Sequence, residues 1–300
     1  MYGAPPLRVA VTGASGMVGT ALATALRADG HTVVPLVRRT PRAGEVAWDP
    51  AHGRIDAAGL EGLDAVVHLA GESLAALWTS ARKRKIRDSR VGGTTLLATA
   101  LAGLARKPAV LISASAVGIY GDRGDEPLDE QSPTGTGFLA DVARAWEASA
   151  APAAAAGIRV AHPRFGMVLS PAGGGLARLL PLFQLGLGGR LGSGAQWMPA
   201  VAIDDVVGAI RHAIATPALS GPFNLSIPEP VTNAEFTRTL ARILHRPAIF
   251  VAPAHLLRLV LDGLADETLL GSARVEPKAL LESGYRFKCP TIESALRCVL

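Results

Sequence analysis

The chain has 300 residues, a formal net charge of +5 at pH 7, and 49% hydrophobic but only 5% aromatic residues. Its length predicts one large α/β domain with an added lobe, or two domains, with a core built mainly from Ala, Leu and Val. The charge comes without a basic arm carrying interleaved aromatic residues, and no apolar stretch reaches membrane length unbroken, so neither nucleic acid nor a membrane is an expected partner.

The two cysteines, Cys289 and Cys298, are too few to support a disulfide framework or a zinc site. We therefore expect a reducing, cytoplasmic compartment and no metal. Residues 1–8 are too short to hold the hydrophobic region of a signal peptide before the first predicted strand.

Five short, unalternating apolar segments are typical of a parallel sheet covered on both faces. These predicted strands are residues 7–12, 31–37, 65–69, 109–114 and 158–164. Predicted helices lie between them, over residues 17–28, 79–104 and 137–156, the last interrupted at Pro152. This alternation predicts an α/β fold with a doubly wound parallel sheet and right-handed crossovers.

The character of the chain changes after residue 164. Glycine-rich segments at residues 173–175 and 185–194 are predicted to be mobile. The elements predicted next are a helix over 204–216, a strand over 221–226 and a helix over 232–244. The last helix begins with the capping-box spacing of Thr232 and Glu235. From residue 246 onward we expect a small helical lobe.

Three glycines lie between the first predicted strand and the first predicted helix. Gly13 permits a tight turn, Gly16 lets the backbone approach a phosphate, and Gly19 lets the helix pack closely on the strand. Free N–H groups and the positive helix end then face the anion. In this position the turn predicts a dinucleotide pyrophosphate site rather than a simple helix start. The other turn residues expected to share the site are Ser15, Met17 and Val18.

The end of the second predicted strand indicates which dinucleotide is bound. An acidic residue near this point usually binds the ribose 2′-hydroxyl of NAD, whereas a 2′-phosphate requires cationic donors. Residues 36–40 contain no acidic residue but two arginines, Arg38 and Arg39. The pair favours NADP(H); the alternative is two exposed loop arginines.

Four motifs, in this order, resemble those of the extended short-chain dehydrogenase/reductase superfamily, of the NAD-dependent epimerase/dehydratase type. They are T-G-A-S-G-M-V-G at 12–19, D-A-V-V-H-L-A-G at 64–71, S-R-V-G-G-T at 89–94 and S-A-S-A-V-G-I-Y-G at 113–121. An atypical epimerase-like branch resembles the chain more closely, because it also carries A-G-E at 70–72, the tract at 185–194 and a small C-terminal domain of unknown function.

This resemblance implies an NADP(H)-binding Rossmann domain over residues 1–165, to which residues 200–225 return. It implies a smaller C-terminal α/β substrate lobe and helical domain over 166–300. Asp204 and Asp205 resemble the family segment that tethers the lobe to the sheet.

The resemblance also assigns residues around the cofactor. Arg90 stands where the family usually has an Asn lining the cofactor, so Arg90, and Lys85 on the same helix, are expected to reach the phosphates or ribose. The alternative for this basic helix is a solvated face. Met167 is expected near the nicotinamide end. The residues expected to leave room beside the adenine ribose are Leu69, Ala70 and Gly71.

The catalytic residues depart from the family pattern. Ser115 follows the fourth strand, where the superfamily uses a Ser to hydrogen-bond the substrate oxygen; the alternative is a strand-end serine that hydrogen-bonds its own backbone. The usual Tyr and the Lys four residues later are replaced by Phe138 and Val142, neither of which transfers a proton. Tyr120 is the only tyrosine near Ser115 and is a catalytic candidate, although its Tyr-Gly pair commonly plays a structural role.

Further candidates for substrate binding lie in loops. Glu72 follows the cofactor-lining segment in a predicted cleft, with an ordinary loop carboxylate as the alternative. Gln196 and Trp197 lie in a glycine-flanked loop that is expected to contact substrate. By contrast, Asp141 and Glu147 are interpreted as helix-surface charges.

These features predict an NADP(H)-binding oxidoreductase or epimerase acting on an unidentified small carbonyl or hydroxyl compound. The missing Tyr-Lys pair supports an alternative, a non-catalytic NADP(H)-sensing protein with a regulatory or protein-interaction role. The superfamily resemblance also implies a homodimer through the helices at 79–104 and 137–156.

Overall fold

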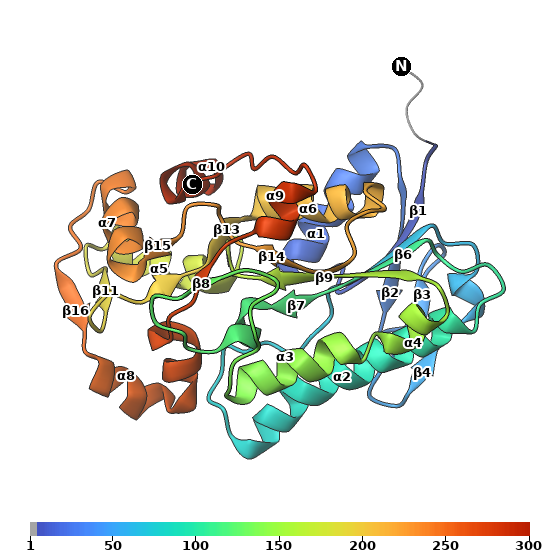
Figure 1. Ribbon diagram of the computed structural model, residues 1–300, viewed down its shortest axis with the longest axis horizontal. Coiled ribbons are helices and arrows are strands. Elements are labelled where there is room, and N and C mark those ends of the chain that lie inside the picture. Colours follow the sequence, from blue (N-terminus) through green and yellow to red (C-terminus); the bar gives the residue numbers. More distant parts are fainter. Residues whose placement is uncertain (1–4) are drawn as a thin grey trace.

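The structure, a computed structural model, describes residues 5–300 (Figure 1). Residues 1–4, which the predicted first domain and the predicted lack of a signal peptide include, lie outside the described residues. A central sheet organises the chain in the strand order β14-β9-β6-β5-β1-β2-β3-β4. Neighbours pair in parallel, except for β3 with β4, and a short β7 (Ser115–Ala116) pairs with β9 beyond β6. The strands are β1 (Arg8–Thr12), β2 (Thr32–Val37), β3 (Val46–Asp49), β4 (Arg54–Ile55), β5 (Ala65–His68), β6 (Val110–Ser113), β9 (Arg159–Phe165) and β14 (Gly221–Leu225).

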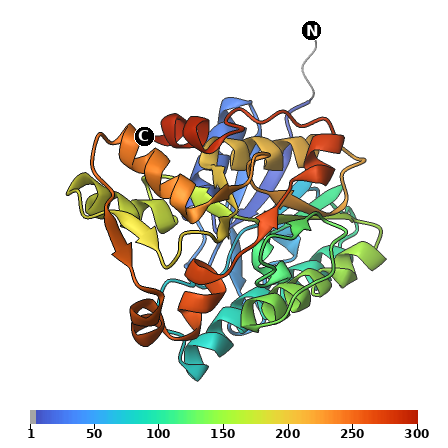
Figure 2. The ribbon, with the colours of Figure 1, turned by 60° about the vertical axis from the view of Figure 1, so that its left-hand side comes forward.

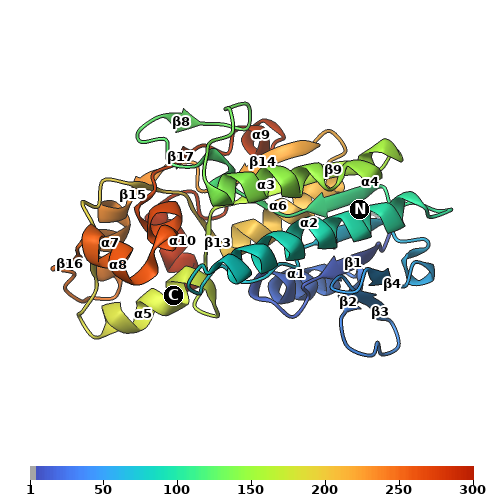
Figure 3. The same ribbon diagram turned by 90° about the horizontal axis from the view of Figure 1, so that it is seen from below.

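Helices cover both faces of this sheet, as Figures 1 and 3 show. One face packs against α1 (Met17–Ala28) and α6 (Ile203–Ala215), and the other against α2 (Ser80–Ala102) and α4 (Ala151–Ala155). Alternate residues of each strand enter the two cores, so Val9 and Val11 face α1 while Ala10 faces α2. The predicted doubly wound Rossmann sheet is therefore confirmed. The predicted helix over 137–156 is interrupted, as expected: α3 (Phe138–Ala148) ends just before α4, which has Pro152 in its first turn.

The lobe is built from helices and short strand pairs (Figure 2). Its paired strands are β10 (Met167–Leu169) with β13 (Ala200–Ala202), β11 (Gly189–Leu191) with β16 (Phe250–Ala252), β12 (Trp197–Met198) with β15 (Val231–Thr232), and β17 (Arg274–Val275) with β8 (Pro127–Leu128). Its helices are α5 (Gly174–Gln184), α7 (Asn233–Ile243), α8 (Ala254–Leu261), a π-helical turn (Ala265–Leu270), α9 (Lys278–Glu282) and α10 (Ile292–Val299). Short 3₁₀ turns lie at Ala58–Leu60 and Val117–Tyr120.

The expectation that the glycine-rich segments are mobile was wrong in its premise, since they contain regular structure. They form the start of α5 and strand β11. Gly189 is a glycine because a Cβ there would lie 2.1 Å from the Phe250 carbonyl oxygen of the paired strand. The C-terminal region is mainly helical, as expected, and its two short strands, β16 and β17, each pair with a distant segment. The capping box of Thr232 and Glu235 at α7 is confirmed.

The cysteines contradict the expectation drawn from their number. Cys289 and Cys298 form a disulfide, because the turn before α10 brings residue 298 back beside residue 289. The cytoplasmic prediction depended on reduced cysteines and loses that support. Among residues 5–300, no helix has the length and apolar character needed to cross a bilayer.

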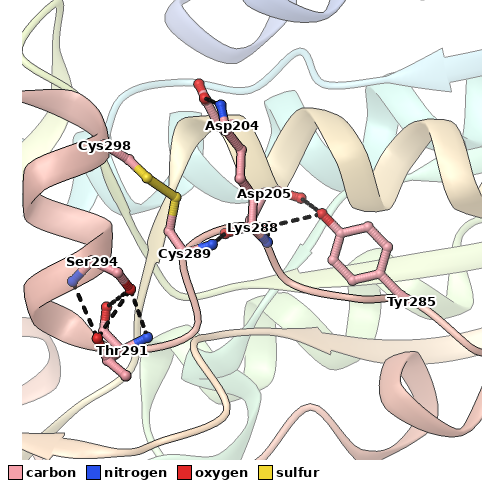
Figure 4. The surroundings of a disulfide bond; sticks show 8 residues. All are labelled: Asp204, Asp205, Tyr285, Lys288, Cys289, Thr291, Ser294 and Cys298. Atoms are coloured by element: carbon pink, nitrogen blue, oxygen red, sulfur yellow. Dashed lines mark hydrogen bonds and ion pairs between the residues drawn. A yellow bond between two sulfur atoms is a disulfide. The ribbon is translucent and has the colours of Figure 1, made fainter.

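A buried carboxylate ties the C-terminal segment to the Rossmann domain (Figure 4). Asp205, in the first turn of α6, is fully buried. One of its oxygens accepts hydrogen bonds from the Lys288 amide at 2.7 Å and the Tyr285 hydroxyl at 3.0 Å, and the other from the Cys289 amide at 2.9 Å. The neighbouring Asp204 reaches only the exposed Lys288 ammonium. The tethering role expected for this pair is confirmed for Asp205.

Replacing Asp205 by Ala is expected to lower the free energy of unfolding by about 2–4 kcal/mol, because three donors lose their acceptor in a dry interior. Urea unfolding of the oxidised protein measures the change. Asp204→Ala is the matched control and should have little effect, since its ion pair is exposed to water. Equal effects of the two substitutions would contradict the tether.

Candidate functional site

The glycine turn before α1 leaves no room for side chains. Gly13 has a φ of +67°, and a Cβ on Gly19 would lie 2.1 Å from the Gly13 carbonyl oxygen. The first turn of α1 therefore lies directly against the end of β1. No side chain caps this helix and no acid lies in its first turn, so its first N–H groups stay available. Exposed Ser15 and Gly16 complete a cradle that fits a phosphate anion.

Thr12 joins this turn to the loop after β5. Its hydroxyl oxygen accepts hydrogen bonds from the Leu69 amide at 3.0 Å and the Ala70 amide at 3.1 Å. The hydroxyl hydrogen is then left to donate to Nδ1 of His68, 2.7 Å away, so His68 carries its proton on Nε2. The segment predicted to lie beside the cofactor thus lies beside the glycine turn, since a Cβ on Gly13 would be 3.1 Å from the Ala70 nitrogen.

A hollow of about 260 Å³ lies at the carboxyl ends of β2 and β3. Arg38, Arg39 and Arg54 line it, together with apolar residues of both strands and the carboxylates of Asp49 and Asp56. Arg39 is already paired, because its guanidinium donates to both oxygens of Glu45 at 2.6 and 2.7 Å. Arg54 was not among the predicted residues; the β3–β4 hairpin brings it next to Asp49.

The basic residues of α2 divide between the interior and the solvent, with Arg84, Lys85 and Arg87 exposed. The Arg90 guanidinium lies 5.0 Å from the centre of the Trp146 ring and donates to the carbonyls of Glu72 and Ile86. Burial lowers the pKa of Arg90 to about 10. Lys85 is exposed, and the Glu72 carboxylate lies 2.6 Å from Arg82, which neutralises it.

Ser115 belongs to a buried polar network. Its hydroxyl donates to Glu147 at 2.6 Å, and the same carboxylate receives two hydrogen bonds from Arg164 at 2.8 and 3.0 Å. Burial acts to raise the pKa of Glu147, but the hydrogen bonds and charge of Arg164 outweigh it, and the pKa is lowered. Glu147 therefore stays ionised as a proton acceptor beside Ser115. Its interpretation as a surface charge was wrong, because its side chain is only 16% exposed.

Tyr120 closes the other end of this network and does not suit direct catalysis. It is fully buried, donates to the Asn224 amide oxygen at 2.8 Å and accepts a hydrogen bond from Arg164 at 2.8 Å. Burial raises the pKa of Tyr120. Its hydroxyl already donates one hydrogen bond and accepts another inside the core, so the structure favours a structural role for Tyr120 over the catalytic one.

The family's Tyr and Lys positions on α3 hold an apolar and aromatic cluster. Phe138 lies edge-on to Trp78 at 5.2 Å, with the Lys83 ammonium 5.2 Å from the Phe138 ring centre. Val142 is buried. Glu267 of the lobe accepts hydrogen bonds from the amide of Phe138 and its neighbour, so the lobe caps the N-terminus of α3.

The predicted lobe residues divide into two groups. Gln196 is buried and donates to the carbonyls of Leu191 and Leu269, so its assignment to substrate contact is corrected to a structural role. Trp197 is half-buried and bonds Asp125 through its indole N–H.

Met167 and Met17 contact the segment at residues 173–175. Hypothetical Cβ atoms on Gly175 and Gly173 would lie 3.1 Å from the Met167 sulfur and 3.4 Å from the Met17 sulfur, respectively.

Comparison with known proteins places this geometry in a family. A model described as the NAD dependent epimerase/dehydratase family matches residues 9–226. The chain belongs to this family. A second model, for a domain of unknown function (DUF1731), matches residues 252–299. The relationship expected from the motifs and the C-terminal domain is therefore confirmed.

Individual relatives extend over nearly the whole chain. An epimerase family protein of Mycobacterium tuberculosis (strain CDC 1551 / Oshkosh) is 47% identical over 290 residues, covering 96% of each chain. The crystal structure of human epimerase family protein SDR39U1 (isoform 2) with NADPH is similar with a TM-score of 0.89 and 32% identity, covering 98% of this chain and 99% of that chain. The crystal structure of a nucleoside-diphosphate sugar epimerase from Corynebacterium glutamicum is similar with a TM-score of 0.81 and 40% identity. The match covers 97% of this chain but 57% of that chain.

Acidification is expected to lower the stability of the fold through His68, which lies at the carboxyl end of the central strand β5. Burial lowers the pKa of His68 to about 4, against 6.5 for the ordinary side chain. Between these values only the unfolded chain binds the proton, so stability present above pH 6.5 is lost as the pH falls, by about 2 kcal/mol at pH 5. Urea unfolding at pH 7 and pH 5 measures this loss in the free energy of unfolding. In His68→Asn the loss between the two pH values should be smaller by about 2 kcal/mol. An equal loss in both proteins would rule out His68 as its source.

Proposed function

We propose that the protein is an NADP(H)-dependent oxidoreductase or epimerase that acts on a small carbonyl or hydroxyl compound. The observation that carries the proposal is the uncapped N-terminus of α1, packed against β1 through Gly19, together with the arginine-lined hollow at the end of β2, the strand that pairs with β1. Its 32%-identical human relative, whose structure was solved with NADPH, supports the choice of nucleotide.

Different residues of the chain are assigned to the two phosphate-containing parts of the cofactor. The backbone N–H groups at Gly13–Val18 hold the pyrophosphate at the positive end of α1. Arg38 and Arg54 hold the 2′-phosphate, because Arg39 is already neutralised by Glu45. Once bound, the nicotinamide supplies the hydride chemistry, and the protein supplies orientation and proton transfer.

Proton transfer is assigned to Ser115 and Glu147. The Ser115 hydroxyl donates to Glu147 and leaves its oxygen free to accept a hydrogen bond from a substrate hydroxyl. When that hydroxyl is oxidised, its proton passes to the Ser115 oxygen as the Ser115 proton passes to the Glu147 carboxylate. Arg164 keeps Glu147 ionised and fixes its orientation. This pair replaces the Tyr and Lys that α3 lacks.

Removing the cationic donor at the end of β2 should change nucleotide preference. Arg38→Ala is expected to weaken NADPH binding by about tenfold to a hundredfold, the value of a charge-assisted hydrogen bond, and to leave NADH binding within about twofold. Calorimetric titration measures both. Arg27→Ala, an exposed arginine at the other end of α1, is the control and should affect neither. An equal loss for NADPH and NADH would show that Arg38 does not contact the 2′-phosphate.

Substitutions at the proposed proton-transfer pair should lower turnover without lowering NADPH affinity. Ser115→Ala and Glu147→Gln are each expected to lower the rate of hydroxyl-dependent NADP⁺ reduction by about 100-fold or more. Asp141→Asn, on the exposed face of the same helix, is the matched control. Thermal unfolding of Glu147→Gln checks that the protein stays folded when Arg164 loses its charged partner. Full turnover in Ser115→Ala would remove Ser115 from the mechanism.

A second candidate function follows from Phe138 and Val142, which leave α3 without a proton donor. In this case the protein binds NADP(H) and reports its redox state to a partner without turning it over. A panel of carbonyl and hydroxyl compounds separates the two candidates. Tight NADPH binding with no oxidation by any member, together with a partner captured only in one redox state, would favour the sensor.

A further inference from the structure

Arg274, in strand β17 of the lobe, is a half-buried arginine whose donors are not used within the protein. Its guanidinium lies over the Trp197 ring, with Cζ 5.0 Å from the ring centre. Its Nε is buried, and among residues 5–300 the side chain forms neither a hydrogen bond nor an ion pair. Two other arginines lie over aromatic rings, and both are hydrogen-bonded, Arg90 to carbonyls and Arg164 to Glu147. Because a buried donor without an acceptor costs free energy, Arg274 needs an acceptor from outside the chain.

The Trp197 ring under this guanidinium is held firmly. Its indole N–H donates to Asp125 at 2.8 Å, and its backbone amide donates to the Ser272 hydroxyl oxygen at 3.0 Å. The Ser272 hydroxyl in turn donates to the Gly124 carbonyl at 2.7 Å. A guanidinium that lies over a ring keeps its N–H groups free around its edge. The contact with Trp197 therefore orients the donors of Arg274 without using them.

Arg274 lies close to the segment that carries Ser115. Strand β17 pairs with β8, and Figure 3 shows the two strands side by side. The adjacent Val275 is buried in one cluster with residues of the turn Val117–Tyr120, which begins two residues after Ser115. The Arg274 side chain instead lies over Trp197 of the lobe. Arg274 is thus placed between the lobe and the segment that holds the proposed proton-transfer serine.

The charges near Arg274 fit an anion with a single negative charge. Arg123, on the loop before β8, is neutralised by Glu126 through two hydrogen bonds at 2.5 and 2.8 Å. Asp122 and Asp125 of the same loop form no ion pair within the described residues, so they repel an anion that carries further charge. One guanidinium binds one carboxylate through two parallel hydrogen bonds, whereas a diphosphate needs additional cations. The surroundings of Arg274 therefore favour a carboxylate over a nucleoside diphosphate.

We propose that Arg274, stacked on Trp197, binds the carboxylate of the substrate, which is then a hydroxy or keto carboxylic acid and not a sugar nucleotide. This inference rests on the proposed function, because it names the class of the carbonyl or hydroxyl compound assigned there. Ser115 binds the reacting hydroxyl, and Arg274 binds the carboxylate of the same molecule. A compound without the carboxylate leaves the guanidinium unpaired and binds weakly, which makes Arg274 a specificity-determining residue.

Trp197 fluorescence tests this proposal without any turnover. The probes are lactate, glycerate and mandelate, compared with the neutral lactamide and with inorganic phosphate and UDP. The chain has four tryptophans, so the Trp197→Phe variant identifies the signal of this ring. The carboxylates are expected to change the Trp197 emission and to bind at least about tenfold more tightly than lactamide, phosphate or UDP, as a charge-assisted pair implies.

Substitutions of Arg274 separate binding from a structural role. Arg274→Gln should weaken carboxylate binding by about tenfold to a hundredfold. It should leave NADPH affinity and the thermal unfolding midpoint nearly unchanged, because no hydrogen bond to another residue is lost. Arg274→Lys keeps the charge without the paired donors and should retain part of the affinity. Arg286→Gln, at an exposed arginine of the lobe, is the matched control and should bind like the parent.

Three results would overturn the proposal: carboxylate binding that survives in Arg274→Gln, tighter binding of UDP or phosphate that depends on Arg274, or no effect of any carboxylate at millimolar concentration. A lowered unfolding midpoint in Arg274→Gln with unchanged binding would also overturn it, because the residue would then be structural. Carboxylate binding through Arg274 in a protein that does not bind NADPH would support this site and contradict the proposed function.

Discussion

The site depends on one close contact, between the first turn of α1 and the end of β1. Because Gly19 has no side chain, α1 approaches the Gly13 carbonyl closely enough to point its uncapped N–H groups along the carboxyl edge of the sheet. Thr12 fixes the neighbouring loop to the same edge through two backbone amides. A methyl group at residue 19 would push the helix away, and both the anion cradle and the segment beside it would lose their positions.

A chain of buried polar contacts continues from this edge into the lobe. Ser115, Glu147, Arg164 and Tyr120 follow one another through hydrogen bonds, and Tyr120 reaches Asn224 on β14. The Asn224 side chain in turn donates to the carbonyl of Glu276 in the lobe. Such a network is costly to break, because each member left unpaired loses its hydrogen bond in a dry interior. The proposed proton-transfer pair is therefore held rigidly, with the lobe as one of its supports.

Local pattern predicted the Rossmann sheet, the glycine turn and the capping box of α7, because each depends on residues close in sequence. The glycine-rich segments misled, since Gly189 serves a strand pairing with residues sixty positions away. The role of Glu147 was equally hidden, because Arg164 and Ser115 meet it only after folding. Arg54 depends on a hairpin too short for a periodic signal. Two cysteines close in sequence formed a bond that counting alone did not suggest.

Amide hydrogen exchange with and without NADPH tests where the dinucleotide binds. Saturating NADPH is expected to slow exchange in peptides covering residues 13–19 and 36–40, because those amides lie against the phosphates and the adenosine end. Exchange in α8, at the far end of the lobe, should not change. NADPH binding that protects other segments and leaves residues 13–19 unaffected would contradict the assignment of this turn as the dinucleotide site.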